Sequence, residues 1–357
     1  QGIITIVLIL GVIAFPVLML KHPYSIFSTI ASCIMFFVLL FELVLIKGYL
    51  SFLFKKRTSS NVFGIIKPSS EVKIRVLIEG HTDSAKQMKI AEISNKRLAV
   101  VFFVLSISYS VFMFIFPLVK IILLIINSSS FDHYAFTIFE VTQIDLYGMP
   151  IGLILFVFFL IFVIGLFGDE IVMGANDNLS STATTIALSK YFKKYRPRNT
   201  ELILASMGAE EIGEQGAKDF AKKHPELLKN TLCFVLECVG AGKELLVIKR
   251  DFMHITKYDS EVISLITQAH ELYSQSNSDV LPIRVGNLIL GSSDASMYSK
   301  KGYQSTFVIM LDESSTKPEN WHEKTDTVEN INKKNLKDIL GITICFVKIV
   351  DEMYDKK

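Results

Sequence analysis

Histidine and carboxylate side chains follow three apolar, strand-like runs of this 357-residue chain. His81 and Asp83 lie in the segment GHTDS, Glu210 and Glu211 lie in GAEEIG, and Glu237 ends the run LCFVLE. Side chains at the carboxyl end of a sheet strand point into the crevice where α/β proteins bind ligands. Because imidazole and carboxylate are zinc ligands, these strand ends are candidates for a metal site.

The adjacent carboxylates Glu210 and Glu211 repel each other. A divalent cation reverses that cost, because one carboxylate can bind the metal while its neighbour takes a proton from water. The alternative is a solvated acidic turn that opens a helix expected from residue 213, where the helix dipole favours negative charge. Asp83 lies two residues after His81, on the same side of an extended chain, and can accept a hydrogen bond from the second ring nitrogen.

Two further segments place candidate ligands just before helices. GANDN presents Asp177 at the start of a helix expected over 180–194, where an ordinary N-cap is the simpler interpretation. WHEKTDT places His322 before the last expected helix, where a histidine alone could be a surface residue. Only the joint pattern of all the segments favours a metal site.

In their order along the chain, GHTDS, GANDN, GAEEIGEQGA, the strand-end acid Glu237 and HEKTDT resemble the motifs of the zinc aminopeptidases of peptidase family M28. The resemblance covers about 58–84 and 169–357. It implies a mixed central sheet flanked by helices, a peptide substrate and two zinc ions, or another divalent metal. It also implies that His81 and Glu237 bind one ion, that Glu211 and His322 bind the other, and that Asp177 bridges them.

The same resemblance implies that Glu210 is the general base and that Asp83 orients His81. Two residues depart from the family pattern. The family usually has an aspartate at the position of Glu237, which in aminopeptidases also helps to hold the free amine of the substrate, so the direction of exopeptidase action stays open. Some members have an oxyanion-supporting tyrosine at the position of Trp321, which we expect to form a pocket wall.

A further stretch, GSSDA, resembles the substrate-side G-S-D-H segment of the family but lacks its histidine, which makes Asp294 a candidate substrate contact. Two other functions stay open. A glutaminyl cyclase shares this fold and uses a single zinc ion on much the same ligands. A receptor or scaffold could keep the fold without the chemistry, although retention of Glu210 and all five candidate ligands argues against it.

The composition also indicates that part of the chain lies in a membrane. Half of the residues are hydrophobic and the mean hydropathy is +0.42, which is too apolar for an ordinary soluble protein. Four apolar segments, at about 3–20, 25–46, 98–126 and 150–168, approach or exceed the roughly 18 residues of a membrane-spanning helix. We therefore expect about four transmembrane helices, of which the first could instead be a signal sequence.

Charge and cysteine content exclude other classes. A net charge of +2 offers no basic field for nucleic acid, and the four cysteines form no C-x-x-C pair, which disfavours a disulfide framework or a cysteine-based zinc site. The segment after the second apolar run, 47–97, is rich in Lys and Arg, whereas 127–149 has none. The positive-inside rule then predicts a multi-pass membrane protein with its catalytic domain on the cytoplasmic side.

Strand-like and helix-like runs alternate elsewhere, as in layered α/β domains. Strands are expected at 61–66, 72–79, 201–205, 232–237, 245–248 and 305–311, and helices at about 180–194, 213–224, 259–275 and 329–356. The two early runs should pair into the later sheet. The expected division is two transmembrane helices in 1–57, the first part of the catalytic domain in 58–97, an inserted transmembrane hairpin in 98–168, and the rest of the catalytic domain in 169–357.

Overall fold

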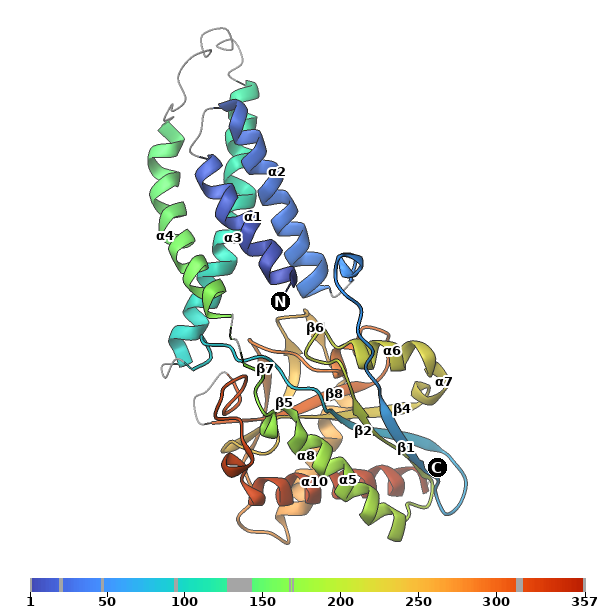
Figure 1. Ribbon diagram of the computed structural model, residues 1–357. Helices are drawn as coiled ribbons and strands as arrows, with labels where there is room; N and C mark the ends of the chain where they lie inside the picture. The colour runs from blue at the N-terminus through green and yellow to red at the C-terminus, as the bar shows by residue number, and fades with distance from the viewer. Residues whose placement is uncertain are drawn as a thin grey trace. The chain divides into compact units, whose positions relative to one another are not determined.

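The computed structural model describes residues 2–18, 22–45, 48–92, 96–126, 143–166, 168, 170–312 and 317–355. The chain divides into two compact units, each made from two separate stretches of sequence. One unit comprises Gln1–Lys56 and Met88–Gly168 and is helical, and the other comprises Arg57–Gln87 and Asp169–Lys357 and is an α/β unit (Figure 1).

Among its described residues, the helical unit contains four apolar helices. They are α1 (Gly2–Leu18), α2 (His22–Val38, continued by the π-helical turn η1, Leu39–Val44), α3 (Lys96–Ile126) and α4 (Gln143–Gly165), with a short 3-10 turn, η2, at Ser51–Leu53. Their shared core includes Phe15, Met35, Tyr109 and Phe159. Within this unit the carboxylate of Asp145 accepts hydrogen bonds from the buried ammonium of Lys120 at 2.9 and 3.0 Å, so both charges are paired.

Two helices, and not about four, are long and apolar enough to cross a membrane among the residues that the structure describes. They are Val101–Ile122 and Asp145–Gly165. Helix α1 has 17 residues, or about 25 Å at 1.5 Å per residue, whereas the bilayer core is about 30 Å thick. Helix α2 also has 17 residues before its hydrogen-bond pattern changes at η1, so these two predicted spans are shorter apolar helices.

The α/β unit is built on a mixed, eight-stranded sheet, which confirms the expected fold. Its order is β1-β3-β2-β4-β8-β5-β6, with β7 also paired to β5. The strands are β1 (Val62–Ile66), β2 (Ile74–His81), β3 (Thr200–Met207), β4 (Thr231–Glu237), β5 (Glu244–Asp251), β6 (Thr256–Lys257), β7 (Ile283–Leu288) and β8 (Ser305–Leu311). Strand β2 lies parallel between β3 and β4, which confirms that the early runs join the later sheet.

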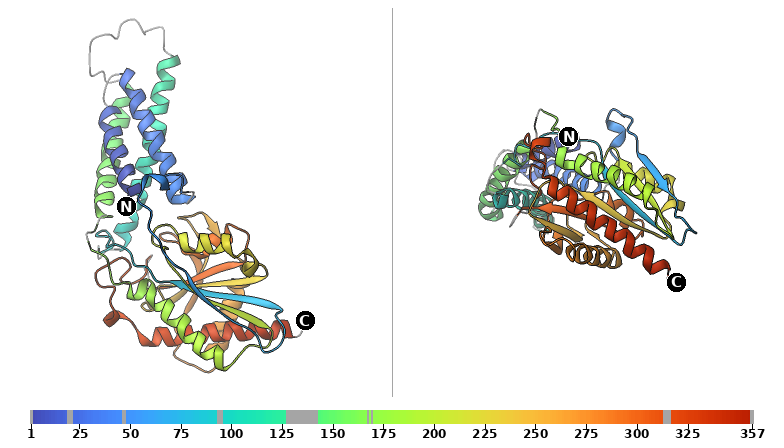
Figure 2. Two further views of the ribbon diagram at one scale, coloured as in Figure 1. Left: turned by 45° about the vertical axis from the view of Figure 1, so that its right-hand side comes forward. Right: turned by 90° about the horizontal axis from the view of Figure 1, so that it is seen from below.

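Helices cover both faces of this sheet (Figure 2). One face carries α5 (Ser180–Lys194), α8 (Ser260–Ser274) and α10 (Lys333–Asp355), which follows the short turn η5 (Val328–Asn330). The other carries α6 (Gln215–Lys223), α7 (Pro225–Leu228) and α9 (Ala295–Ser299). Since side chains alternate along a strand, Val76 and Ile78 of β2 join the first core, while Glu79 and His81 point to the opposite face. There the hydroxyl of Tyr298, on α9, donates to Glu79 at 2.7 Å.

Candidate metal centre

Two neighbouring strands of the α/β unit end at candidate metal ligands. Glu79 of β2 pairs with Val235 of β4, and two residues later the strands end at His81 and Glu237. This register brings His81 Nε2 to 3.4 Å from Glu237 Oε1. Both side chains are buried, so they form the floor of the site.

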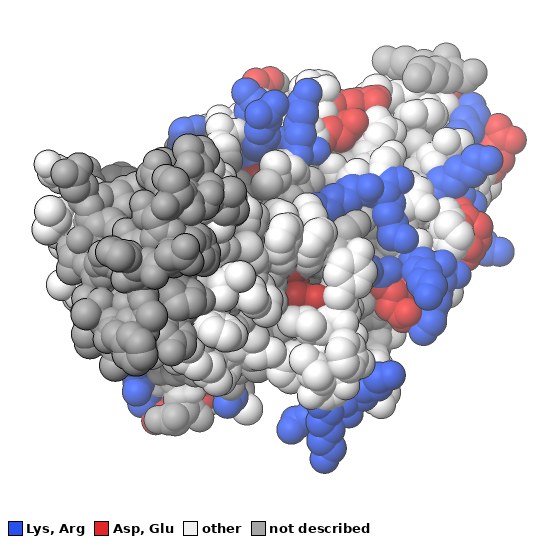
Figure 3. All heavy atoms as spheres, turned by 90° about the horizontal axis from the view of Figure 1, so that it is seen from above, with Lys and Arg blue, Asp and Glu red and all other residues white. Residues whose placement is uncertain are grey.

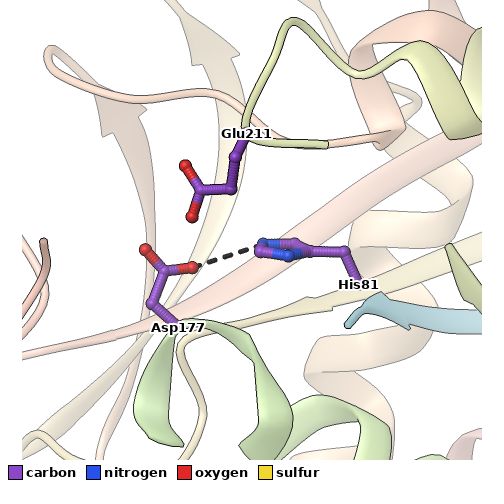
Figure 4. A group of neighbouring side chains, drawn as sticks. All are labelled: His81, Asp177 and Glu211. Carbon is purple, nitrogen blue, oxygen red and sulfur yellow. Dashed lines mark ion pairs between the residues drawn. The ribbon is translucent and has the colours of Figure 1, made fainter. Parts of the chain in front are cut away.

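Asp177 lies between two histidines that are far apart in the sequence. It belongs to the irregular turn η4 (Ala175–Leu179), which precedes α5. Its Oδ1 lies 3.3 Å from His81 Nε2, and its Oδ2 lies 3.2 Å from His322 Nε2. Glu211, in the loop after β3, places Oε2 at 3.2 Å from the same nitrogen of His322. Figure 4 shows Asp177, His81 and Glu211 pointing toward one another.

These distances suit a tetrahedral metal. Donor atoms that each lie about 2 Å from one zinc ion are about 3.3 Å apart. Within the described part of the chain, three buried carboxylate oxygens here make no hydrogen bond, namely Asp177 Oδ2, Glu211 Oε1 and Glu237 Oε2. Buried carboxylate oxygens without a hydrogen bond are costly, and a cation would compensate them, so the residues present fit a divalent metal.

Asp83 has a different contact from the expected one. Its carboxylate accepts hydrogen bonds from the backbone N–H groups of Glu210, at 3.0 Å, and Glu211, at 3.1 Å. The carboxylate is 3.6 Å from Nδ1 of His81, and the closer contact of that nitrogen is the backbone oxygen of Asp83, at 3.1 Å. Asp83 therefore fixes the Glu210–Glu211 loop with its carboxylate and contacts His81 with its main chain.

Sequence reasoning assigned no role to Asp326, which holds Asp177 in place. The fully buried Asp326 carboxylate accepts hydrogen bonds from the backbone N–H groups of Asn176, at 2.5 Å, and Asp177, at 3.1 Å. The available signal was a carboxylate four residues after His322 in the segment HEKTDT. Its partner, in contrast, lies on a distant loop and is visible only in the structure.

Sequence reasoning also gave no role to Cys238, the residue after Glu237. Its buried Sγ lies 3.7 Å from Glu237 Oε1, and the pair forms, together with Asp177, a third group of closely spaced donor atoms. The other two groups combine His81 with Asp177 and Glu211, and His81 with Glu210 and Glu237. Asp177 thus belongs to two of the three groups of closely spaced donor atoms.

Burial and the concentration of charge shift the protonation of the cluster. Burial raises the pKa of Glu237 to about 7 and raises that of Glu210 well above its usual range. Burial lowers the pKa of His81, but the nearby carboxylates, Glu210 first, outweigh it and raise that pKa well above normal. At neutral pH the metal-free cluster therefore holds extra protons, which a metal would displace.

The two candidate substrate contacts lie in different settings. Trp321 stacks on His322, with ring centroids 4.3 Å apart and planes inclined by 29°. Asp294 precedes α9, is 1% exposed, and neither of its carboxylate oxygens has a hydrogen-bond partner in the described residues. The pKa of Glu210 is raised first by burial and further by neighbouring carboxylates that include Asp294. Asp294 is thus close enough to the cluster to interact with it electrostatically.

A comparison of the sequence with models of protein families identifies the family of this chain. Residues 154–347, more than half of the chain, match the model of peptidase family M28. The chain belongs to peptidase family M28. The matched range of this M28 chain contains Asp177, Glu210, Glu211, Glu237 and His322, but not His81, which lies on the other side of α3. No curated protein matches the chain.

Solved structures resemble this M28 chain in fold. The zinc aminopeptidase of Bacillus subtilis has 18% identity and a TM-score of 0.50, with 83% of this chain and 51% of that chain covered. A Zn-dependent exopeptidase from Parabacteroides distasonis has 12% identity and a TM-score of 0.50, with 80% and 76% covered. Glutaminyl cyclase of Bacteroides thetaiotaomicron has 14% identity and a TM-score of 0.49, with 80% and 76% covered. The chain spans about half the length of the B. subtilis aminopeptidase.

Proposed function

We propose that this chain is a membrane-anchored peptidase that uses two zinc ions to hydrolyse peptide bonds and removes N-terminal residues from peptides near the membrane. The observation that carries the proposal is the position of Asp177. Its two carboxylate oxygens face two different imidazoles, at 3.3 and 3.2 Å, as a ligand shared by two metal ions would. Each imidazole has a second carboxylate at a similar distance, from Glu237 or Glu211.

In this proposal His81 and Glu237 hold one zinc ion, His322 and Glu211 hold the other, and Asp177 is shared. When bound, the ions supply Lewis acidity that polarises the scissile carbonyl and lowers the pKa of water. The side chains of His322 and Glu211 are 14% and 11% exposed, against 2% for His81. Substrate would therefore reach the centre over the His322 and Glu211 side.

Glu210 is the proposed general base. Its Oε2 lies 3.7 Å from His81 Nε2 and its side chain is 14% exposed, so it faces the accessible side of the cluster. Burial holds the pKa of Glu210 well above its usual range, which suits a group that must both take and give a proton. Glu210 takes the proton of the attacking water and passes it to the leaving amine, while Asp83 fixes the backbone of Glu210.

Asp294 is the proposed anchor for the free amine of the substrate. Its two buried oxygens have no hydrogen-bond partner among the described residues and can accept hydrogen bonds from an ammonium group. Such a contact would select the N-terminus of a peptide even though Glu237 replaces the usual aspartate. The indole of Trp321, stacked on His322, would form the wall of the same pocket.

The membrane part of the proposal rests on the apolar helices. Helices α3 and α4 have the length and composition of spans, and we propose that they form an inserted transmembrane hairpin, with 58–97 and 169–357 forming one catalytic domain on the cytoplasmic side. A reporter fused after Lys357 tests the orientation. Activity of a cytoplasmic reporter is expected, and activity only of an external reporter would contradict it.

The chemistry is tested by metal analysis of the purified full-length protein and by digestion of a peptide library read by mass spectrometry. Two zinc ions per chain and the loss of single N-terminal residues are expected. Glu210→Gln should lower the rate by about 100-fold or more, because proton transfer by a positioned base contributes that much. Glu226→Gln, at an exposed carboxylate of α7, is the matched control and should keep full activity.

Three other results of these experiments would favour a different function. Internal or C-terminal cuts would overturn the aminopeptidase assignment. One zinc ion per chain together with cyclisation of N-terminal glutamine would identify a glutaminyl cyclase. A zinc-loaded protein that cleaves nothing, and whose cellular role survives Glu210→Gln, would be a scaffold.

A further inference from the structure

The hairpin between β5 and β6 exposes apolar side chains at its tip. Arg250 pairs with Lys257 and Asp251 pairs with Thr256, so residues 252–255 form the turn. Within this turn Phe252 is 56% exposed, Met253 38% and Ile255 72%. A solvated turn usually carries polar residues, so a tip of this composition needs a partner that accepts apolar groups.

Polar contacts beneath the tip hold it in this orientation. His254, the one buried residue of the turn, places Nδ1 at 2.9 Å from Glu214 Oε1, and its backbone N–H donates to Asp251 at 2.6 Å. The hydroxyl of Tyr258 donates to the other oxygen of Asp251, also at 2.6 Å. Because Asp251, His254 and Tyr258 are buried and paired beneath the tip, its apolar side chains face outward.

The stem of the hairpin is cationic. Lys249, Arg250 and Lys257 are exposed and line a surface hollow of about 440 Å³ together with Tyr258 and Asn287. Across the described ranges, none of these three cations forms an ion pair with a carboxylate. Three uncompensated positive charges beside an apolar tip favour a partner that is anionic at its surface and apolar beneath it.

Two neighbouring loops add apolar side chains to the same region. The backbone N–H of Phe252 donates to Leu288 O at 3.0 Å, which brings in the loop of Ile289, a residue that is 42% exposed. The contact between His254 and Glu214 brings in the loop of Ile212, which is 70% exposed. In Figure 3, Lys and Arg side chains form separate groups on the described surface, with Asp and Glu side chains beside several of them.

We propose that the hairpin is a lipid-docking element, in which the tip 252–255 enters the interface of an anionic phospholipid bilayer and the stem cations bind headgroup phosphates. The inference rests on the proposed membrane anchorage, because an anchored chain meets a bilayer throughout its life. An aromatic and two aliphatic side chains next to Lys and Arg are the composition of interfacial anchors.

Docking would also act on the proposed catalytic loop. Glu214, which contacts His254, donates its backbone N–H to Glu210 O at 2.7 Å. The hairpin tip and the loop that carries Glu210 are therefore joined by two successive polar contacts. A tip held at the lipid surface would keep the proposed base close to peptides that partition into that surface.

The test uses tryptophan fluorescence of the full-length protein in lipid vesicles. Trp321 is the single tryptophan, so Trp321→Phe gives a dark background into which Phe252→Trp is introduced as a reporter. Vesicles contain phosphatidylglycerol and lipids with brominated acyl chains, which quench tryptophan on contact. We expect loss of fluorescence from the reporter at 252. The matched control, Val328→Trp, replaces a residue that is 65% exposed in the same unit and should keep its fluorescence.

Further experiments test whether the partner is an anionic lipid surface. In phosphatidylglycerol vesicles, Lys249→Glu combined with Arg250→Glu should reduce quenching to the level seen with zwitterionic lipid. Equal quenching at positions 252 and 328, or none at either, would overturn the proposal. Binding of inorganic phosphate to the stem with an unquenched tip would identify a free-anion site and overturn the lipid assignment. Cleavage of a soluble peptide by protein that keeps both Trp321 and Phe252 reports the proposed peptidase activity separately, so an unquenched reporter at 252 with intact cleavage by that protein overturns only the docking.

Discussion

Asp177 is the residue on which the proposed chemistry depends most. Its two oxygens can serve two ions only if its backbone is held at a fixed angle to both histidines. The turn that carries it has irregular dihedral angles, φ −110° and ψ 86°, so the helix that follows does not hold it. The carboxylate of Asp326 supplies that restraint through the backbone N–H groups of Asn176 and Asp177.

Asp326→Asn should therefore weaken zinc binding without removing a ligand. The amide keeps one acceptor for two N–H donors, so Asp177 loses part of its orientation. Replacing such supporting groups costs about 10–100-fold in metal affinity or activity. Competition with a chromophoric chelator measures the affinity, and Glu329→Gln, at an exposed position three residues later, is the control. Unchanged affinity in the Asp326 variant would show that the turn holds itself.

Sequence patterns predict the position of a side chain within a strand or helix better than they predict its hydrogen-bond partners. His81 and Glu237 end apolar runs, so their position at strand ends follows from the chain alone. The partners of Asp83 and Asp326 do not, because each carboxylate bonds to backbone groups more than a hundred residues away. Backbone N–H groups are present at every residue except proline, so no sequence motif marks those that are used.

At the scale of elements, length and a clear apolar pattern decide which helices and strands can be predicted from the sequence. The predicted strand 305–311 and helix 180–194 coincide with β8 and α5, because both combine length with a clear apolar pattern. The sequence patterns do not predict strand β7, since IRVGNL contains Arg284, Gly286 and Asn287 and half of its residues are exposed. Helix α9 has five residues, too few for helical periodicity, and it is not predicted either.

The carboxylate of Asp351 binds helix α10 to the backbone at the start of β3. Asp351 accepts hydrogen bonds from the backbone N–H groups of Arg198, Asn199 and Thr200, at 2.7, 2.7 and 2.8 Å. Asp351→Ala leaves three donors without this partner and should lower the free energy of unfolding by about 2–3 kcal/mol. Thermal or denaturant unfolding measures the change, with the exposed neighbour Glu352→Ala as control. Equal stability of the two variants would mean that water replaces the carboxylate at no cost.

At the scale of the whole molecule, the chain builds one sheet from two distant stretches. Strands β1 and β2 precede the helical insertion, yet β2 lies between β3 and β4, which follow it. His81 and Asp177 therefore meet only after the chain has passed through α3 and α4. The candidate metal centre depends on closure of this loop, and a metal that binds His81, Asp177 and Glu237 would tie the two stretches together.

Zinc should consequently stabilise the whole protein, and more so at higher pH. In the metal-free cluster, burial raises the pKa of Glu237 to about 7, and for His322 the effect of burial is outweighed by Glu211 and Asp177, which raise its pKa to about 10. A folded-state pKa above the unfolded value gives stability that is present at low pH and lost as pH rises through the folded pKa. Both groups therefore make the metal-free protein less stable as pH rises from about 5 to 10.

Zinc removes this loss by replacing the protons of the cluster. The difference in melting temperature between zinc-loaded and chelator-treated protein should be larger at about pH 8 than at about pH 6, since more of the buried carboxylate charge needs a cation at the higher pH. Differential scanning fluorimetry at the two pH values measures it, and His322→Ala should reduce the difference at both. A zinc effect that stays equal or shrinks as pH rises would show that the cluster does not exchange protons for metal.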